Sequence, residues 1–309
     1  MHTAYITHPL CAKHLIADWH PEAPARLAAI DDRLHAAQLF DYLCHFHHPP
    51  LATKEQLSRV HDLTYIDHIF ASAPTEPGHY ELDPDTAMNE HSLAAALHAA
   101  GAAVRAVDKV MASKVQNAFC AIRPPGHHAT RNQAMGFCIF NNVAVAAAHA
   151  LVEHGLKRVA IVDFDVHHGN GTEDIFQADE RVLLCSTFQH PFYPYSGADT
   201  VSDHIINVPL PAGTTGRAYR AAFEARILPA LDAFKPEMIL FSAGFDSHRE
   251  DDMGQFGLVE ADFIWITETV MDIAARHADK RIVSVLEGGY DLNSLGRSVA
   301  AHIKTLAGL

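Results

Sequence analysis

Four ionisable side chains follow one apolar segment, and their types and spacing indicate metal chemistry. The run Val159–Val162 is typical of a strand buried on both faces, and it is followed directly by Asp163, Asp165, His167 and His168. Carboxylates and imidazoles are costly to bury without partners, and a divalent cation would supply the missing charge. Because side chains alternate along an extended segment, Asp163, Asp165 and His167 are expected to face the same way. The alternative is a strand end whose polar groups cap a neighbouring helix.

Three further polar clusters also follow strand-like apolar runs. They are RPPGHH after Val115–Ile122, SAGFD after Met238–Phe241 and EGGY after Arg281–Leu286. In an open parallel sheet, ligands bind outside the carboxyl ends of the strands, so all four segments are predicted to converge at one rim. Each cluster also has a plain structural interpretation, such as a rigid loop, a helix N-cap at Asp246 or a simple turn. That all four clusters follow strands only for such structural reasons is less expected than that they form one site.

The predicted rim contains the donors of a catalytic metal site. Asp165, His167 and Asp246 offer three nitrogen or oxygen ligands. Catalytic zinc sites have three protein ligands and an open position for water, whose pKa falls to about 7 when it is bound. The sequence therefore predicts metal-assisted hydrolysis.

The other polar side chains of the rim suit acid–base chemistry. His127 and His128 are candidates for a general base that becomes the general acid to the leaving group. Tyr290 follows two glycines and offers a hydroxyl that would stabilise the oxyanion of a tetrahedral intermediate. His168 is left without such a role and is interpreted as a structural histidine.

The rest of the chain predicts an α/β fold in which a single open parallel sheet is flanked by helices on both faces. Strands are expected at 115–122, 158–164, 182–187, 204–208, 238–242 and 281–286, and helices at 24–40, 87–114, 140–154, 217–234, 262–276 and 294–307, with helical pieces over 54–70. Segments 5–24, 45–50 and 71–85 are expected to be irregular, the last as a surface loop or a rim of the site. No linker or internal repeat divides the chain, so residues 1–309 are predicted to form a single domain.

Composition narrows the function classes. A net charge of −14 argues against nucleic-acid binding, because no basic stripe exists to neutralise phosphates. No signal pattern and no apolar run of membrane-spanning length is visible, and five cysteines without a CxxC pair suggest free thiols in a reducing compartment. These features predict a soluble cytoplasmic protein without membrane partners. The 24 histidines produce doublets by chance, so doublets alone identify no site.

Five motifs in order resemble the zinc-dependent histone deacetylase family, with class II-like and bacterial-type amidohydrolase features. They are RPPGHHA at 123–129, GFCIFNNVA at 136–144, VDFDVHHGNGTEDIF at 162–176, SAGFDSH at 242–248 and LEGGYDL at 286–292. His20-Pro21-Glu22 and Arg26-Leu27 fit as well, so the resemblance covers essentially the whole chain. It implies the arginase–deacetylase fold and one Zn²⁺ per chain.

The resemblance also implies a role for each matching position. Asp165, His167 and Asp246 would be the zinc ligands, His127 and His128 the tandem catalytic pair with His128 as base and acid, and Tyr290 the transition-state hydroxyl. Asp163 would orient His127, and Asn170 would orient His128. A structural potassium ion would be held by oxygens of Asp163, Asp165, His167, Ser186 and Thr187.

A narrow substrate channel is implied in the same way. Phe137 and Tyr193 match its aromatic walls, the Gly136 carbonyl would hold the amide N–H, and Gly289 and Met253 complete it. Three positions are informative departures: Asn170 stands where class I relatives carry Asp, Tyr193 where Phe is commoner, and Met253 where polyamine-selective relatives carry a Glu. The last departure weakens a polyamine interpretation.

The leading hypothesis is removal of an acyl group, most simply acetyl, from an Nε-lysine side chain of a protein or peptide. Deacylation of an N-acetylpolyamine or another small N-acetylated amine by the same residues is the first alternative. A binuclear manganese hydrolase of the arginase type would need more carboxylates at the rim, and a non-catalytic acyl-lysine-binding module would not need the intact catalytic set. A homo-oligomer is compatible with the sequence.

Overall fold

The computed structural model describes residues 2–309, which build an eight-stranded sheet with the strand order β2-β1-β5-β10-β9-β6-β7-β8. Every pairing within this sheet is parallel, as predicted from the alternation of strands and helices. Its strands are β1 (Thr3–Ile6), β2 (Cys44–Phe46), β5 (Asn117–Cys120), β6 (Val159–Asp163), β7 (Val182–Gln189), β8 (Ile205–Leu210), β9 (Met238–Ala243) and β10 (Ile282–Leu286).

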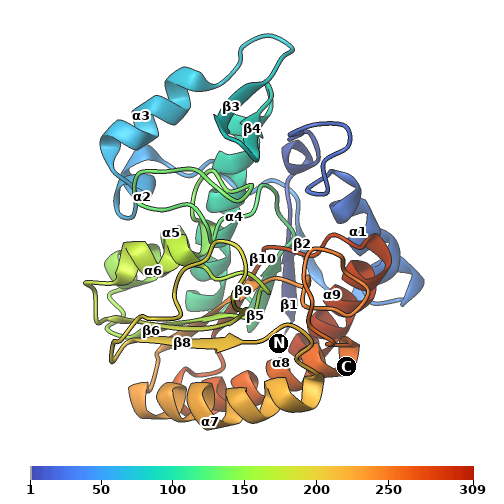
Figure 1. Cartoon of the computed structure of the whole chain (residues 1–309), viewed down its shortest axis with the longest axis vertical. Helices are drawn as coiled ribbons and strands as arrows, with labels where there is room; N and C mark the ends of the chain where they lie inside the picture. The colour runs from blue at the N-terminus through green and yellow to red at the C-terminus, as the bar shows by residue number, and fades with distance from the viewer. Residues whose placement is uncertain (1) are drawn as a thin grey trace.

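Helices cover both faces of the sheet (Figure 1), which confirms the predicted fold class. On one face α4 packs on β1, β5 and β10, and α5 packs on β6 and β9; on the other, α7 packs on β7 and β8, and α9 on β1 and β5. The helices are α1 (Ala25–Ala36), α2 (Lys54–Ser58), α3 (Leu63–Ser72), α4 (Ser92–Met111), α5 (Asn142–Val152), α6 (Asn170–Phe176), α7 (Gly216–Phe234), α8 (Glu260–His277) and α9 (Leu292–Ala307).

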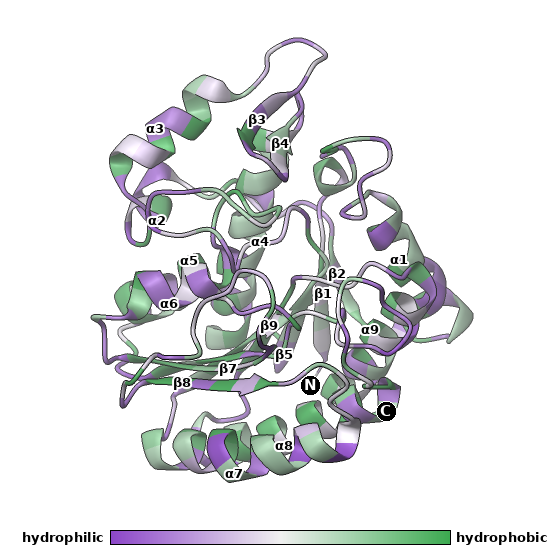
Figure 2. Ribbon diagram, in the orientation of Figure 1, coloured by the Kyte–Doolittle hydropathy of each residue, from purple (hydrophilic) through white to green (hydrophobic). Residues whose placement is uncertain are grey.

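The hydrophobic core lies between the sheet and these two helical layers. All residues of β5, β6, β7, β9 and β10 are buried, and the buried apolar side chains form one cluster. Figure 2 shows the hydrophobic colouring of the central strands, while hydrophilic residues appear along the outer helices such as α7. Strands buried on both faces explain why their sequences are continuous apolar runs rather than alternating ones.

The four strands that precede the polar clusters are adjacent in space. They form the contiguous series β5-β10-β9-β6 at the centre of the sheet, although β7 and β8 lie between β6 and β9 in sequence. Because these strands are parallel, their carboxyl ends meet at one edge, as the sequence predicted.

Several short elements differ from the sequence-based expectation. Strands β1 and β2 overlap segments 5–24 and 45–50, which are predicted to be irregular. Strands of three or four residues carry too little periodicity to be recognised without their partners. Segment 71–85 is predicted to be a loop and 87–114 a helix, but an antiparallel hairpin spans the end of the first and the start of the second. Its strands are β3 (Tyr80–Asp83) and β4 (Thr86–Met88). Helix α6, which follows the loop after β6, is not predicted from the sequence either.

The five cysteines are free thiols, four of them buried. Burial raises the pKa of the Cys11 thiol to about 11, so it stays protonated at neutral pH. No helix in the described part of the chain is long and apolar enough to cross a membrane.

Candidate active site

Asp165, His167 and Asp246 converge at the carboxyl edge of the sheet, and their ligand atoms all lie within 4.8 Å of one another. His167 Nδ1 is 3.0 Å from Asp165 Oδ1 and 3.2 Å from Asp246 Oδ2. The first two residues follow β6 and the third follows β9, which are hydrogen-bonded neighbours in the sheet. All three side chains are almost completely buried.

Two glycines allow these carboxylates to approach the backbone. A Cβ atom at Gly244 would lie 2.0 Å from Asp165 Oδ2, and one at Gly288 would lie 2.1 Å from Asp246 Oδ2. Instead, the Gly288 N–H donates to Asp165 Oδ2 at 2.9 Å and the Val166 N–H donates to Asp246 Oδ1 at 2.9 Å. These bonds hold the carboxylates in place while leaving oxygens turned toward His167.

The electrostatics of this cluster favour a cation. Burial and the nearby Asp165 carboxylate raise the pKa of Asp246 to about 7. Burial alone would lower the pKa of His167, but its bonds to Asp165 and Asp246 outweigh it and raise the pKa to about 10. Among residues 2–309, neither carboxylate forms an ion pair with a lysine or arginine. A divalent metal among one nitrogen and two oxygen donors would supply the missing charge.

The tandem histidines lie beside this cluster, each oriented by a partner from the β6–α6 segment. His127 Nδ1 is 3.0 Å from Asp163 Oδ2, and His128 Nδ1 is 2.7 Å from Asn170 Oδ1. Burial opposes a charge on His127, but the carboxylates of Asp163 and Asp165 raise its pKa to about 10. Burial, together with the nearby His127 and His167, lowers the pKa of His128 well below its usual value. The two histidines therefore differ in charge at neutral pH: His127 carries a proton on both ring nitrogens, and His128 is neutral.

A cavity of about 290 Å³ opens onto these groups. It brings together most of the channel residues expected from the sequence, and it is lined by His128, Gly136, Phe137, His167, Tyr193, Met253 and Tyr290, with Asp85, Phe192 and Asp252 in addition. Gly136 has φ +56°, and a Cβ there would lie 2.4 Å from His128 Cδ2, so the backbone approaches this ring closely.

Gly289, expected in the channel, is not among the residues that line this cavity. It has φ +120°, and its missing Cβ would point toward Leu295 and Phe245 in the core. Its carbonyl accepts a hydrogen bond of 2.6 Å from Arg26 Nε. Gly289 therefore shapes the turn that carries Tyr290.

Tyr290 is held by Asp251, which the sequence did not single out, and by Arg26, which entered only as part of the family resemblance and without a role. Asp251 Oδ2 accepts the Tyr290 N–H at 2.6 Å and the Asp291 N–H at 3.0 Å. The Arg26 guanidinium lies 4.8 Å from the centre of the Tyr290 ring. Both residues are distant in sequence from the EGGY motif, so only information about which residues are in contact could have linked them to Tyr290.

Arg26 belongs to a buried ion network beneath the site. Glu22 lies between two guanidinium groups, with Oε1 3.0 Å from Arg26 Nη1 and Oε2 2.5 Å from Arg123 Nη2. Burial alone would raise the pKa of Glu22, but Arg123 and Arg26 lower it to about 2. Arg26 Nη2 also donates to the Glu287 carbonyl oxygen, and the Glu287 side chain in turn accepts the backbone N–H groups of Gly126 and His127 through Oε2. The network thus ties the N-terminal segment to two of the site's strand ends.

A second cavity, of about 710 Å³, adjoins the first and shares Asp85 and Phe137 with it. Its other acidic lining residues are Asp18, Glu81 and Asp83, and the exposed Trp19 lies at the same cavity. Lysine and arginine are absent from the residues that line it. The β3–β4 hairpin therefore contributes to the rim, with an acidic face beside the channel mouth.

Ser186 and Thr187, two of the residues expected to hold a monovalent cation, lie in β7, which pairs with β6. Ser186 Oγ is buried and has no hydrogen-bond partner among the described residues, and Thr187 Oγ1 is 3.5 Å from the Asp163 carbonyl oxygen. An unpartnered buried hydroxyl is costly, so it fits an oxygen ligand better than a packing role. His168, by contrast, pairs with Glu173 at 2.8 Å and with Ser196 at 2.9 Å, away from the cavity lining.

Comparisons with known proteins show the family of the chain. A family model described as the histone deacetylase domain matches residues 20–306. The chain is 39% identical over 267 residues to a histone deacetylase-like amidohydrolase of Pseudomonas aeruginosa, covering 84% of this chain and 70% of that protein. It is 34% identical over 351 residues to type-2 histone deacetylase 2 of Dictyostelium discoideum, covering 98% of this chain but only 21% of that protein.

Among solved structures, the chain is similar to the HDA15 HD domain. The TM-score is 0.92 at 35% sequence identity, and the match covers 100% of this chain and 89% of the other.

Proposed function

This chain belongs to the histone deacetylase family, and we propose that it hydrolyses the amide bond of an Nε-acetyl-lysine side chain with the help of one bound zinc ion. One observation carries the proposal: Asp165, His167 and Asp246 converge, and His167 lines the same cavity as His128 and Tyr290.

The donor set fits zinc. One imidazole and two carboxylates, buried together without a lysine or arginine partner in the described chain, form a site with three protein ligands. When bound, zinc would act as a Lewis acid that polarises the scissile carbonyl and makes water nucleophilic near neutral pH. The homologues' names support a deacetylase or amidohydrolase activity without naming the metal.

The tandem histidines would divide the proton transfers. Neutral His128 lines the cavity and would take a proton from the attacking water through Nε2, because Asn170 engages its Nδ1 atom. It would then pass this proton to the leaving amine. His127, held protonated by Asp163, would contribute positive charge behind the reacting carbonyl.

Tyr290 would stabilise the developing oxyanion with its hydroxyl group. Its backbone is fixed by Asp251, and its pKa is raised well above the usual value by burial, so the hydroxyl keeps its proton at neutral pH. The Phe137 and Tyr193 rings would flank the apolar lysine stem, and the Gly136 carbonyl would accept the amide N–H of the substrate.

A structural potassium ion would lie behind the zinc site. The unpartnered Ser186 hydroxyl, with oxygens of Asp163, Asp165, His167 and Thr187, would supply its ligands. The expected localisation is cytoplasmic, and the expected partners are acylated proteins or small amines.

Deacetylation of an N-acetylpolyamine is the second candidate. The acidic cavity beside the channel, with Glu81, Asp83 and Asp85, suits a substrate that carries further positive charges. Met253 at the channel rim weakens this candidate because it provides no charge at the mouth. Asp252, which also lines the cavity, does provide a negative charge there.

Turnover of a fluorogenic acetyl-lysine peptide, with and without a zinc chelator, tests the proposal. We expect activity that the chelator abolishes and added zinc restores. Chelator-insensitive turnover would exclude the metal mechanism, and complete inactivity of zinc-loaded protein on a broad acyl-amide panel would favour a binding module. Comparing kcat/KM for acetylputrescine, acetylspermidine and the peptide separates the two substrate classes.

A further inference from the structure

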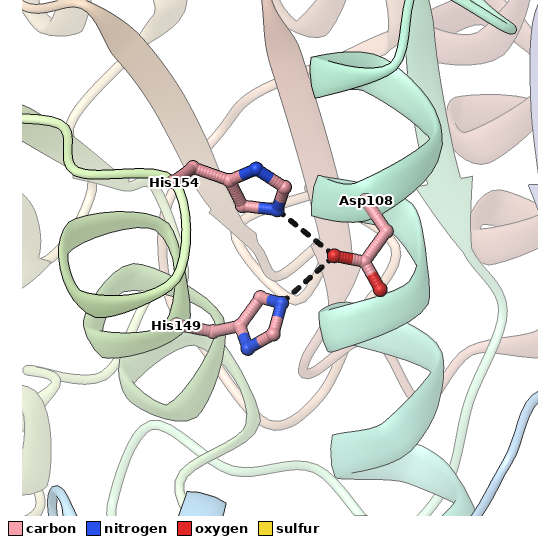
Figure 3. A group of neighbouring side chains, drawn as sticks. All are labelled: Asp108, His149 and His154. Carbon is pink, nitrogen blue, oxygen red and sulfur yellow. Dashed lines mark hydrogen bonds and ion pairs between the residues drawn. The ribbon is translucent and has the colours of Figure 1, made fainter.

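A second group of side chains of metal-ligating types lies where α4 and α5 end, before β5 and β6 begin. It is therefore at the amino edge of the sheet, opposite the carboxyl edge that carries the candidate active site. Asp108 is in the last turn of α4, His149 is in the last turn of α5, and His154 follows α5 in the segment leading to β6. Figure 3 shows both imidazole rings directed at one oxygen of Asp108. The distances from Asp108 Oδ1 are 2.8 Å to His149 Nε2 and 2.9 Å to His154 Nε2.

The surroundings of this cluster are electronegative. Two helices end side by side here, and the carboxyl end of each helix carries a partial negative charge. A carboxylate in the last turn of α4 adds to that charge. Within residues 2–309, Asp108 forms ion pairs with the two histidines but with no lysine or arginine, and the neighbouring Lys109 lies over the Phe46 ring instead.

We propose that Asp108, His149 and His154 bind a divalent transition metal such as zinc, which would tie α4 to α5 and to the segment before β6. The three ligand atoms already lie within 4.8 Å of one another, and the donors belong to the type that zinc accepts. The remaining coordination positions would be taken by water, because Asp108 and His154 are partly exposed. This proposal does not rest on the proposed deacetylase activity.

The present distances show what must change on binding. Ligand atoms around a tetrahedral zinc ion are separated by roughly 3.3 Å, so the observed 2.8–2.9 Å contacts must open by a few tenths of an ångström. His154 can supply this movement because it lies beyond the helix end.

Binding also requires the imidazole proton to move from Nε2 to Nδ1. The Nδ1 atom of His149 is buried without a hydrogen-bond partner among the described residues, so an N–H there would be unsatisfied. We expect this to weaken binding by about ten- to a hundredfold relative to a fully satisfied site. The site should therefore fill only at free zinc concentrations about ten- to a hundredfold higher than a fully satisfied site with the same three ligands requires.

Equilibrium dialysis of the zinc-loaded protein against buffered free zinc, followed by elemental analysis, tests this site. The informative variants are His154→Ala, which removes a partly exposed ligand, and Asp108→Asn, which keeps the size and one acceptor oxygen. His277→Ala is the matched control, because His277 also lies 2.8 Å from a carboxylate, Asp232, but without a second histidine. Circular dichroism checks that each variant is folded.

We expect the wild type and His277→Ala to bind one more zinc per chain than either cluster variant. The midpoint of thermal unfolding should rise with zinc in the first two proteins more than in the others. Equal zinc stoichiometry in wild type and both cluster variants would overturn the proposal, as would an equal loss in His277→Ala. In that case the cluster is a hydrogen-bonded link between the helices and nothing more.

Discussion

The carboxylate of Asp251 accepts the backbone N–H of Tyr290 at 2.6 Å, although the two residues come from loops that follow different strands. The other oxygen of Asp251 accepts the Met253 N–H at 3.0 Å. One buried side chain therefore sets the position of the proposed oxyanion donor and of the channel rim together. This arrangement makes Asp251 a positioning residue, which acts through the backbone of Tyr290.

Replacing Asp251 tests this positioning role. In Asp251→Ala the Tyr290 turn loses its acceptor, and we expect kcat for an acetyl-lysine peptide to fall about tenfold or more, with a smaller change in KM. Asp251→Asn, which keeps one acceptor oxygen, should recover part of kcat. An equal loss in both variants, with unfolding seen by circular dichroism, would indicate a purely structural role.

The hydroxyl of Tyr290 can be removed without changing the ring. In Tyr290→Phe we expect kcat to fall by about 10²–10³, because one preorganised oxyanion donor is lost. The contacts of the ring with Phe137 and Arg26 are retained, so stability should be nearly unchanged. Steady-state kinetics and thermal unfolding measure the two effects, and full activity of the variant would remove Tyr290 from the mechanism.

Gly288 should be essential for binding zinc at the active site. In Gly288→Ala the new Cβ would lie 2.1 Å from Asp246 Oδ2 and 2.6 Å from Asp165 Oδ2, so both carboxylates must move. We expect the variant to lose active-site zinc and activity together. Gly78→Ala is the control, because its Cβ would meet no atom closer than 3.9 Å. Metal content similar to wild type in Gly288→Ala would contradict the assignment of these ligands.

A buried histidine should make stability depend on pH. His302 lies between Thr267 and Ser284 in the core, and burial lowers its pKa to about 3 from an ordinary value near 6.5. Between about pH 6.5 and the folded-state pKa, His302 is protonated in the unfolded chain but not in the folded protein. The free energy of unfolding therefore decreases as the pH falls below about 6.5. The loss from this group approaches ~1.4 kcal/mol per pH unit until its folded pKa is reached.

Denaturant unfolding of wild type and His302→Gln between pH 5 and 8 measures that contribution. The free energy of unfolding should fall more steeply with decreasing pH in the wild type than in the variant. Above pH 7 the difference between the two proteins should be constant. Parallel curves over the whole range would show that His302 titrates normally in the folded state.

The strand-end motifs could be assigned from sequence because two local properties coincide in them. Apolar runs such as Val159–Val162 mark strands buried on both faces, and the polar residues after them stand out against that background. The parallel alternation then places all such ends on one edge. By contrast, β1, β2 and the β3–β4 hairpin are short, and their formation depends on partners distant in sequence.

The residue types and spacing along the chain were sufficient to predict the sheet, its polar edge and the residues Asp165, His167, Asp246, His127, His128 and Tyr290 as one group. Only the tertiary structure revealed Asp251 beneath Tyr290, Asp85 and Asp252 at the cavity, and Asp108 between two histidines. The physical reason is that the first set is defined by covalent neighbours on individual strands. The second depends on contacts between loops and helices, whose relative positions are decided by packing across the whole core.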